Sequence, residues 1–542
     1  MSLLRPLSLA LALLTSAAVL PAQRPGVPMS PGSLRLRLEG YAADSMRGRL
    51  TGTPDNVKAT RYIAEELRKL GLRPAGDSGT FLQRVPLVRT VLDTAASRVT
   101  AGNRGLVPYV DYLPRNQGDS ARSFDGAPVV FAGAWGDPAM LEGDAVRGKT
   151  VILALQPDSF SVVKLAAQAK FAQAAAIVIA NFDLMPRPLL SALAASPIVL
   201  DEATAELPAY MHISVATAAE LLGVPSLREA AIGREGRPLH GAISFRKIPI
   251  EAYNVVAVVP GSDPVLRAEY VAVGAHSDHV GVGEPQDRDS TRAFNLELRR
   301  KQLANNGMVT QSIYQSVVVN MDSIRRIHPV PRMDSIYNGA DDDGSGSMGL
   351  LEIARAFAGE RSKPKRSIVL VWHTGEELGL FGSQHFTDHP TVSLANIVAQ
   401  VNIDMIGRGK PGDELGGGPN YLQLIGSRGL STQLGDLVES VSREKKFDWA
   451  FDYEYDAPGH PEQYYCRSDH YMYARYGIPV VFMTTGGHAD YHEVTDEVDQ
   501  IDFEKLSKVS RFVHALTTTV ANLAARPVVD KPKPDPRAPC VQ

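Results

Sequence analysis

The sequence predicts an α/β protein in which helices cover both faces of a mixed central sheet, with a β-rich α+β module inserted into the chain. Runs at 270–275, 367–372, 397–403 and 479–483 are largely apolar, which is typical of strands buried on both faces of a sheet. Helical patterns separate these runs. From about 97 to 247 the pattern changes to short β-branched runs between loops, which indicates the inserted module.

The size and charge of the chain limit what it can be. It has 542 residues, of which 44% are hydrophobic and 21% charged, which is enough for a large core and more than one domain. The net charge of −4 is small and no Lys/Arg block occurs, so nothing indicates nucleic-acid binding. Two cysteines, Cys466 and Cys540, are too few for a disulfide framework. A single bridge between them and two unbridged thiols both remain open.

The first 23 residues have the pattern of a secretory signal peptide. Arg5 precedes an apolar run at 7–20, and the small-residue ending Pro21-Ala22-Gln23 follows it. No later stretch reaches about 18 uninterrupted apolar residues, so no membrane span is predicted. We therefore expect a secreted or periplasmic protein.

The α/β domain is expected in two pieces, 24–96 and 248–526, on either side of the module at 97–247 and followed by a tail at 527–542. Within the second piece, a polar segment at 283–335 is rich in Asn, Gln and Arg and lacks a strong strand pattern. We expect a surface insertion with some helix there.

Several helices are expected to cover the sheet. Apolar residues spaced at i, i+4, i+8 and i+11 predict a helix over 59–70, with Asp55 capping its start and Gly71 following its end. Similar spacing predicts helices after Ser431 and after Asp502.

An acidic, glycine-rich turn at 338–346 is the strongest local signal. Its three adjacent carboxylates, Asp341, Asp342 and Asp343, repel one another unless a cation lies among them. The apolar spacing that follows predicts a helix, whose first N–H groups also favour negative charge. An isolated turn of this kind is equally typical of a solvated loop. Residues elsewhere in the chain must therefore decide between a metal-binding turn and a solvated loop.

Metal-ligand side chains follow one predicted strand after another. In an open α/β sheet the carboxyl ends of the strands share one crevice, so these side chains are expected to converge. Two His, a shared Asp, another Asp and a Glu suffice for two zinc ions about 3.5–4 Å apart, each with an open position. The candidates are His276, Asp278, Glu376, Glu377, Asp404, His488 and His492.

These motifs, in this order, resemble the secreted zinc aminopeptidases of the aminopeptidase Y and glutamate carboxypeptidase type, in clan MH. The resemblance covers nearly the whole mature chain and implies a zinc-exopeptidase, phosphorylase/hydrolase-like fold. It also implies residue roles. One zinc would be held by His276, Asp342 and Asp404, the other by Asp342, Glu377 and His492, with Glu376 as general base, Asp278 orienting His276 and a cis Asp342–Asp343 peptide.

The module at 97–247 resembles a protease-associated domain. This resemblance rests on its strand order, with runs at 127–132, 150–154 and 176–180, and on a helical segment expected over 162–172. The insertion at 283–335 makes this chain longer than the compact members of the family between His276 and the acidic turn. A lid, a narrower cleft and self-association are three open explanations for it.

The other histidines carry weaker signals. His279, His373 and His470 are expected to be structural. His488 competes with His492, which is favoured because it follows Asp490-Tyr491 and precedes Thr495-Asp496. Ser468 and Asp469, in the segment 467–470, are candidates for lining the substrate pocket.

The expected function is peptide-bond hydrolysis by an exported di-zinc aminopeptidase whose substrate is a peptide with a free N-terminus. A carboxypeptidase or dipeptidase would use the same metals and bind the substrate carboxylate with a loop arginine such as Arg408, Arg428 or Arg467. A glutaminyl cyclase would use one zinc. A non-catalytic, receptor-like module is the remaining alternative, and the sequence does not predict the oligomeric state.

Overall fold

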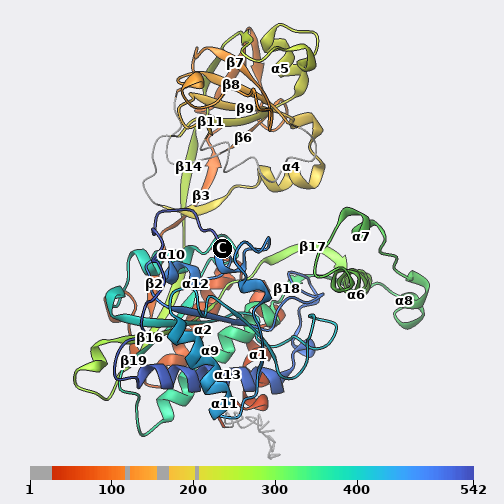
Figure 1. Cartoon of the computed structure of the whole chain (residues 1–542). Coiled ribbons are helices and arrows are strands. Elements are labelled where there is room, and N and C mark those ends of the chain that lie inside the picture. Colours follow the sequence, from red (N-terminus) through yellow and green to blue (C-terminus); the bar gives the residue numbers. More distant parts are fainter. Residues whose placement is uncertain (1–26, 116–122, 156–169, 202–206) are drawn as a thin grey trace, which may run out of the picture.

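The computed structural model describes residues 27–115, 123–155, 170–201 and 207–542. They form a large lower body and a small upper body, joined by a pair of long strands (Figure 1). The predicted signal peptide lies outside the described residues, and so does most of the helix predicted over 162–172.

A nine-stranded mixed sheet forms the centre of the large body. Its strand order is β1-β15-β19-β16-β20-β23-β21-β22, and β2 also pairs with β15. β16 runs parallel to β19 and β20, whereas β15 and β21 join antiparallel. The strands are β1 (Arg73–Pro74), β2 (Leu82–Arg84), β15 (Tyr253–Val259), β16 (Tyr270–His276), β19 (Ser367–His373), β20 (Ile397–Ile403), β21 (Tyr421–Ile425), β22 (Ala450–Asp452) and β23 (Val480–Thr484).

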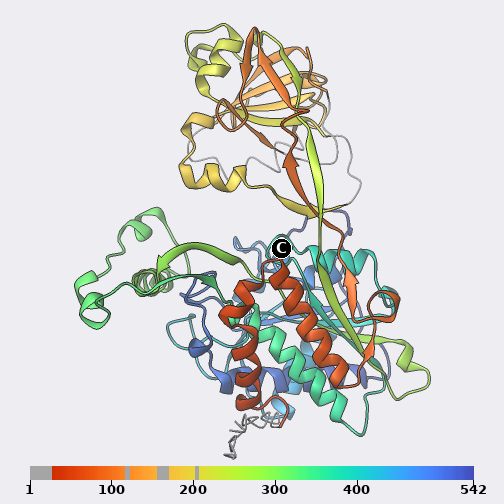
Figure 2. The ribbon, with the colours of Figure 1, turned by 180° about the vertical axis from the view of Figure 1, so that it is seen from behind.

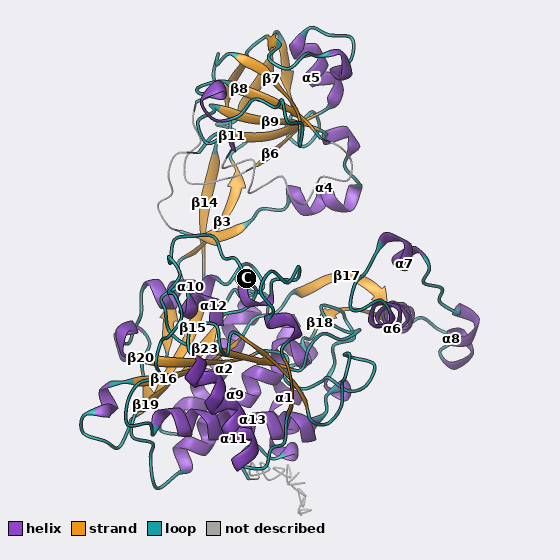
Figure 3. Cartoon of the chain, in the orientation of Figure 1, coloured by secondary structure: helices purple, strands orange, loops and turns teal. Residues whose placement is uncertain are grey.

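Helices pack on both faces of this sheet, so the predicted fold class is confirmed (Figure 3). One face and its helices form the main core, and the other face forms a smaller core. Figure 2 shows the first two helices at the surface of the main layer. The main layer contains α1 (Pro31–Tyr41), α2 (Pro54–Lys69), α9 (Gly346–Gly359), α11 (Thr432–Glu444) and α13 (Phe503–Ala521), and the smaller one contains α10 (Phe381–Asp388) and α12 (His470–Ala474).

The helices predicted for the large body are present, with one change at a helix start. α2 is capped by the Thr53 hydroxyl, which accepts a hydrogen bond from the Asn56 N–H at 3.4 Å, so the expected Asp55 cap is wrong. Asp55 instead lies in the first turn, where its charge still favours the helix N-terminus. Gly71 follows the helix with φ +68, as expected for a C-terminal stop.

The small body has a sheet and cores of its own. A six-stranded sheet has the order β12-β7-β8-β9-β11-β6, with one apolar cluster on each face. A second sheet has the order β13-β4-β5, and β3 (Leu87–Leu92) pairs with β14 (Phe245–Ile250) to connect the two bodies. The other elements are β4 (Arg98–Ala101), β5 (Arg104–Leu106), β6 (Tyr112–Arg115), β7 (Val129–Ala134), β8 (Thr150–Ala154), β9 (Ala176–Ala180), α4 (Arg187–Ala194), β10 (Ile198–Leu200), β11 (Ala209–Ile213), α5 (Val215–Leu222), β12 (Glu235–Gly236) and β13 (Leu239–Ala242).

The insertion forms an arm that stands out from the large body in both views (Figures 1 and 2). It begins and ends with an antiparallel ribbon of β17 (Gly281–Asp287) and β18 (Met333–Tyr337), so the segment contains more strand than its sequence indicated. Between the strands lie α6 (Arg288–Ala304), α7 (Gln311–Gln315) and α8 (Met321–Ile327).

Cys466 and Cys540 form a disulfide that ties the C-terminal tail to the loop before α12. The structure thus selects the bridge from the two possibilities that the sequence left open. Among the described residues, no helix has the length and apolar character needed to cross a membrane.

Candidate metal centre

Two groups of metal-ligand side chains meet at the carboxyl ends of the central strands. The first group contains His276 at the end of β16, Asp342 in the acidic turn and Asp404 just after β20. His276 Nε2 lies 3.1 Å from Asp342 Oδ1 and 3.4 Å from Asp404 Oδ1. The three side chains are buried, and no described protein group hydrogen-bonds to His276 Nε2.

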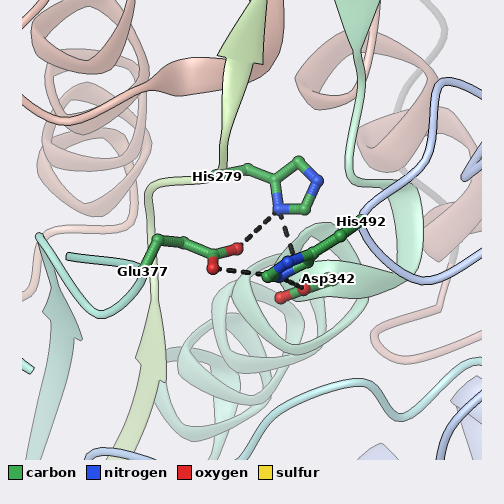
Figure 4. Close-up of side chains that lie close together, drawn as sticks. All are labelled: His279, Asp342, Glu377 and His492. Carbon is green, nitrogen blue, oxygen red and sulfur yellow. Dashed lines mark hydrogen bonds and ion pairs between the residues drawn. The ribbon is translucent and has the colours of Figure 1, made fainter. Parts of the chain in front are cut away.

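The second group contains Asp342, Glu377, His492 and His279 (Figure 4). His492 Nε2 lies 3.0 Å from Asp342 Oδ2 and 2.9 Å from Glu377 Oε2. Asp342 therefore turns one carboxylate oxygen to each group. The five residues predicted as ligands all lie in these two groups.

The surrounding backbone determines which of the three adjacent aspartates faces the histidines. Asp341 Oδ1 accepts from the Gly407 N–H at 2.7 Å, and the Asp343 carboxylate accepts from the N–H groups of His276 and Gly346. Both side chains are thus held by backbone donors. The Asp342 side chain is therefore the one of the three that faces His276 and His492. The peptide between Asp342 and Asp343 is cis.

The electrostatics of the centre favour a cation. Burial opposes a charge on His276, but the carboxylates of Asp404 and Glu376 outweigh burial and raise its pKa well above the ordinary value. For His492, burial is likewise outweighed by Asp342 and Glu377, which raise the pKa to about 10. A bound metal would supply this positive charge and take the imidazole nitrogens as neutral ligands. The donor set, with its unbonded Nε2 atoms, therefore fits metal ions.

Glu376 and Asp278 lie beside the two groups. Glu376 lines a cleft at the centre, whereas Glu377, next in sequence, points to His492. Burial, with Asp404 and Glu377, raises the pKa of Glu376 well above its usual range although His276 opposes this. Asp278 Oδ1 accepts from the Glu376 N–H at 3.3 Å and lies 3.7 Å from His276 Nδ1, which is also 3.2 Å from the Asp278 carbonyl oxygen.

The cleft holds about 590 Å³ of empty space, its open mouth included. The carboxylates of Asp342, Glu376 and Asp404 lie along its lining, together with aromatic side chains. Ser468 also lines the cleft and donates to Asp404 Oδ2 at 2.9 Å. Asp469 does not lie among the lining residues, because its buried carboxylate faces His373 Nδ1 at 3.2 Å.

His279 belongs to the second group, although its sequence position indicated only a structural role. Its Nδ1 lies 2.8 Å from Glu377 Oε1, which leaves Glu377 Oε2 facing His492. No motif distinguishes it from other histidines, since its place depends on the turn after β16. His488, the competitor of His492, is buried with Nε2 3.4 Å from Asp341 Oδ2 and lies in neither group.

The three loop arginines have different positions. Arg408 is buried and pairs with Asp490 at 2.8 Å. Arg428 pairs with Asp436 and Glu439 at the surface. Among the described residues that line the cleft, Arg467 is the one cation.

Comparisons with known proteins indicate the family of this chain. Residues 254–517 match the model of peptidase family M28. The probable leucine aminopeptidase 1 of Trichophyton verrucosum is 24% identical over 306 residues, which cover 54% of this chain and 65% of that protein. Leucine aminopeptidase 2 of Trichophyton equinum is 27% identical over 187 residues, or 34% of this chain and 35% of that protein. The chain therefore matches less than two thirds of the length of each of these relatives.

Among solved structures, an aminopeptidase from Aneurinibacillus sp. strain AM-1 aligns over 94% of this chain and 97% of its own, with 17% identity and a TM-score of 0.48. The family match confirms the relationship that the motifs indicated. It contains every residue of both groups, from His276 to His492. Through this stretch, from 254 to 517, the chain matches peptidase family M28.

Proposed function

We propose that the protein is a di-zinc aminopeptidase that releases residues from the free N-terminus of peptides. One observation carries this proposal: two groups of metal ligands share Asp342 beside a cleft that also contains Glu376. The relatives named as leucine aminopeptidases support it.

In this proposal, His276, Asp342 and Asp404 hold one zinc, and Asp342, Glu377 and His492 hold the other. Bound zinc lowers the pKa of water and polarises the scissile carbonyl. His279 holds Glu377 Oε1, so that the second oxygen of Glu377 keeps its direction. Asp278 orients His276, and it also positions Glu376 by accepting from its N–H.

Glu376 is proposed as the general base. Its carboxylate lines the cleft without taking part in either ligand group, so it can remove a proton from the attacking water and pass it to the leaving amine. The carboxylates that line the cleft also favour a cationic group, such as the α-ammonium of a peptide.

Substitution of Glu376 tests this role. Glu376→Gln should keep two zinc ions per chain, measured by elemental analysis, and lose about 10²–10⁴-fold in kcat on aminoacyl reporter substrates. Glu504→Gln, an exposed glutamate on α13, is the matched control and should retain full activity. A Glu376→Gln enzyme with a nearly unchanged kcat would refute the role, and a metal-loaded wild type inactive on every peptide would refute the function.

A dipeptidase or carboxypeptidase is a second candidate because Arg467 lines the cleft and could bind a substrate carboxylate. Hydrolysis of matched peptides with free and acetylated N-termini separates an aminopeptidase from a carboxypeptidase. An aminopeptidase cleaves only the free-amine substrate, whereas a carboxypeptidase cleaves both.

We also propose that the chain is exported after removal of residues 1–23, and that residues 97–247 form a protease-associated domain inserted between 24–96 and 248–526. The signal-like pattern of the first residues and the strand order of the small body support these proposals. Mass spectrometry of the mature N-terminus tests the first. Limited proteolysis near β3 and β14 tests the second, because it should release a folded fragment.

A further inference from the structure

The arm between β17 and β18 has an exposed apolar tip that lacks a core of its own. Within 288–333, which the structure describes completely, Arg299 alone is buried. Neither α7 nor α8 has a buried residue. A segment that buries so little apolar surface gains little stability from its own packing.

Exposed large apolar side chains gather on this arm. Val318 is 82% exposed, Ile327 74% and Tyr314 54%. Patches of this kind mark interaction sites in soluble proteins. The remaining exposed apolar side chains of the arm are Val282, Leu296, Met308, Val309, Met321, Val330 and Met333.

Most of the tip is also free of charge. From Gln302 to Met321 the sequence contains no Asp, Glu, Lys or Arg over twenty consecutive residues. Beyond this stretch, α8 carries three charged residues, Asp322, Arg325 and Arg326. Arg325 pairs with Asp287, and Arg332, just after the tip, pairs with Asp289.

We propose that the tip of the arm, Gln302–Val330, is a self-association surface that binds the same tip on a second copy of this chain. In a two-fold symmetric dimer, identical residues face each other across the axis, so a charge near the axis meets its own copy. The uncharged stretch from Gln302 to Met321 avoids this repulsion, and its apolar side chains make it complementary to itself. A stable interface needs about 20–30 residues a side, and the tip has this extent.

Other occupants fit the tip less well. Binding to a lipid surface depends on Lys or Arg beside the apolar face. The stretch from Gln302 to Met321 has none, and of the two arginines on α8, Arg325 is paired with Asp287. Different proteins are steered to one another by opposite charges, which the stretch from Gln302 to Met321 does not supply. The root of the arm is not available, because Arg299 is buried against Glu414 in the large body.

The test is the mass of the full chain by sedimentation velocity across a range of micromolar concentrations. We expect the wild type to sediment at twice the chain mass. Val318→Glu and Ile327→Glu should both sediment as monomers, since each places like charges across the axis. Val265→Glu is the control: Val265 is 76% exposed but lies in a loop of the large body, so this variant should remain a dimer.

Circular dichroism shows whether each variant is folded, and the exposed positions should tolerate the substitutions. A wild-type chain that is monomeric throughout the range would overturn the proposal. So would dimers that persist in both arm variants, or that dissociate equally in Val265→Glu. Co-sedimentation of the monomer with zwitterionic or anionic lipid vesicles, lost in Val318→Glu, would assign the tip to a membrane surface instead.

Discussion

Arg299 connects the arm to the loop that carries His492, and its removal should loosen that loop. Its guanidinium donates to Glu414 Oε1 at 2.6 Å, to the Asp413 carbonyl at 2.7 Å and to the Gly487 carbonyl at 3.1 Å. Glu414 Oε1 also accepts from the Gly487 N–H at 2.7 Å. At Gly486, with φ +84, a Cβ would lie 2.4 Å from Glu414 Cγ, so the loop fits closely around this pair.

The cost of Arg299→Met follows from burial. The side chains of Arg299 and Glu414 are only 10% and 3% exposed, and loss of one partner from a buried pair costs about 3–5 kcal/mol because the other charge is left uncompensated. Since about 1.4 kcal/mol corresponds to tenfold, the upper limit on the loss of zinc affinity is about 100- to 4000-fold. This limit is reached only if the whole free-energy cost of losing the ion pair is transmitted to His492 and weakens its binding of zinc.

Three measurements follow the effect. Hydrogen exchange of the segment 484–496 should become faster, zinc affinity measured against a competing chelator should fall, and kcat/KM should fall with it. Arg300→Met is the matched control, because Arg300 is the next residue on α6 but is 67% exposed and pairs with Glu297 at the surface. Such surface pairs contribute about 0–1 kcal/mol.

A double variant separates an uncompensated charge from a general packing defect. Glu414→Gln keeps groups that can bond Gly487 but carries no charge, so Arg299→Met combined with Glu414→Gln should recover part of the loss. If Arg299→Met behaves like Arg300→Met in all three measurements, the loop is not held by the arm and the reasoning is refuted.

Three further outcomes are expected. Arg467 lines the cleft, so Arg467→Leu should raise KM about 10–100-fold for substrates with an acidic group near the scissile bond. The reason is the loss of a charge-assisted hydrogen bond. An equal rise in KM for neutral substrates would contradict this expectation. Burial, with Arg115, lowers the pKa of His212 to about 3, so an unfolded chain binds a proton below pH 6.5 that the folded chain does not. Stability should therefore be lost as pH falls from about 6.5 to 3, at up to about 1.4 kcal/mol per pH unit. The melting temperature of His212→Gln should fall less steeply with acid than that of the wild type, and parallel curves would exclude His212 as the cause. Cys540→Ser removes a bridge with a sequence separation of 74, which should destabilise the folded chain by about 2–4 kcal/mol in denaturant unfolding. Ser440→Ala is the control, because the Ser440 hydroxyl donates to Glu444 on the exposed side of α11.

The sequence predicted the strands of the large body well because burial on both faces leaves a strong apolar pattern. It also placed His276, Glu377 and Asp404 at strand ends, which share one crevice in an open α/β sheet. The position of His279 was not predictable in this way, because a turn rather than a strand directs its ring. The pairing of Arg299 with Glu414 spans 115 residues and has no local signal. At the start of α2, Thr53 and Asp55 are both good caps, and only the backbone geometry distinguishes them.

The antiparallel pair of β3 and β14 has a further consequence. Leu87 pairs with Ile250 and Leu92 with Phe245, so the chain leaves and re-enters the large body through adjacent strands. Opposed residues in such a pair lie only about 4.5–5.5 Å apart, a gap that a tight two-residue turn can span. The segment between Leu92 and Phe245 could therefore be replaced by a short turn or by a different domain. The central sheet of the large body would keep its own strand order.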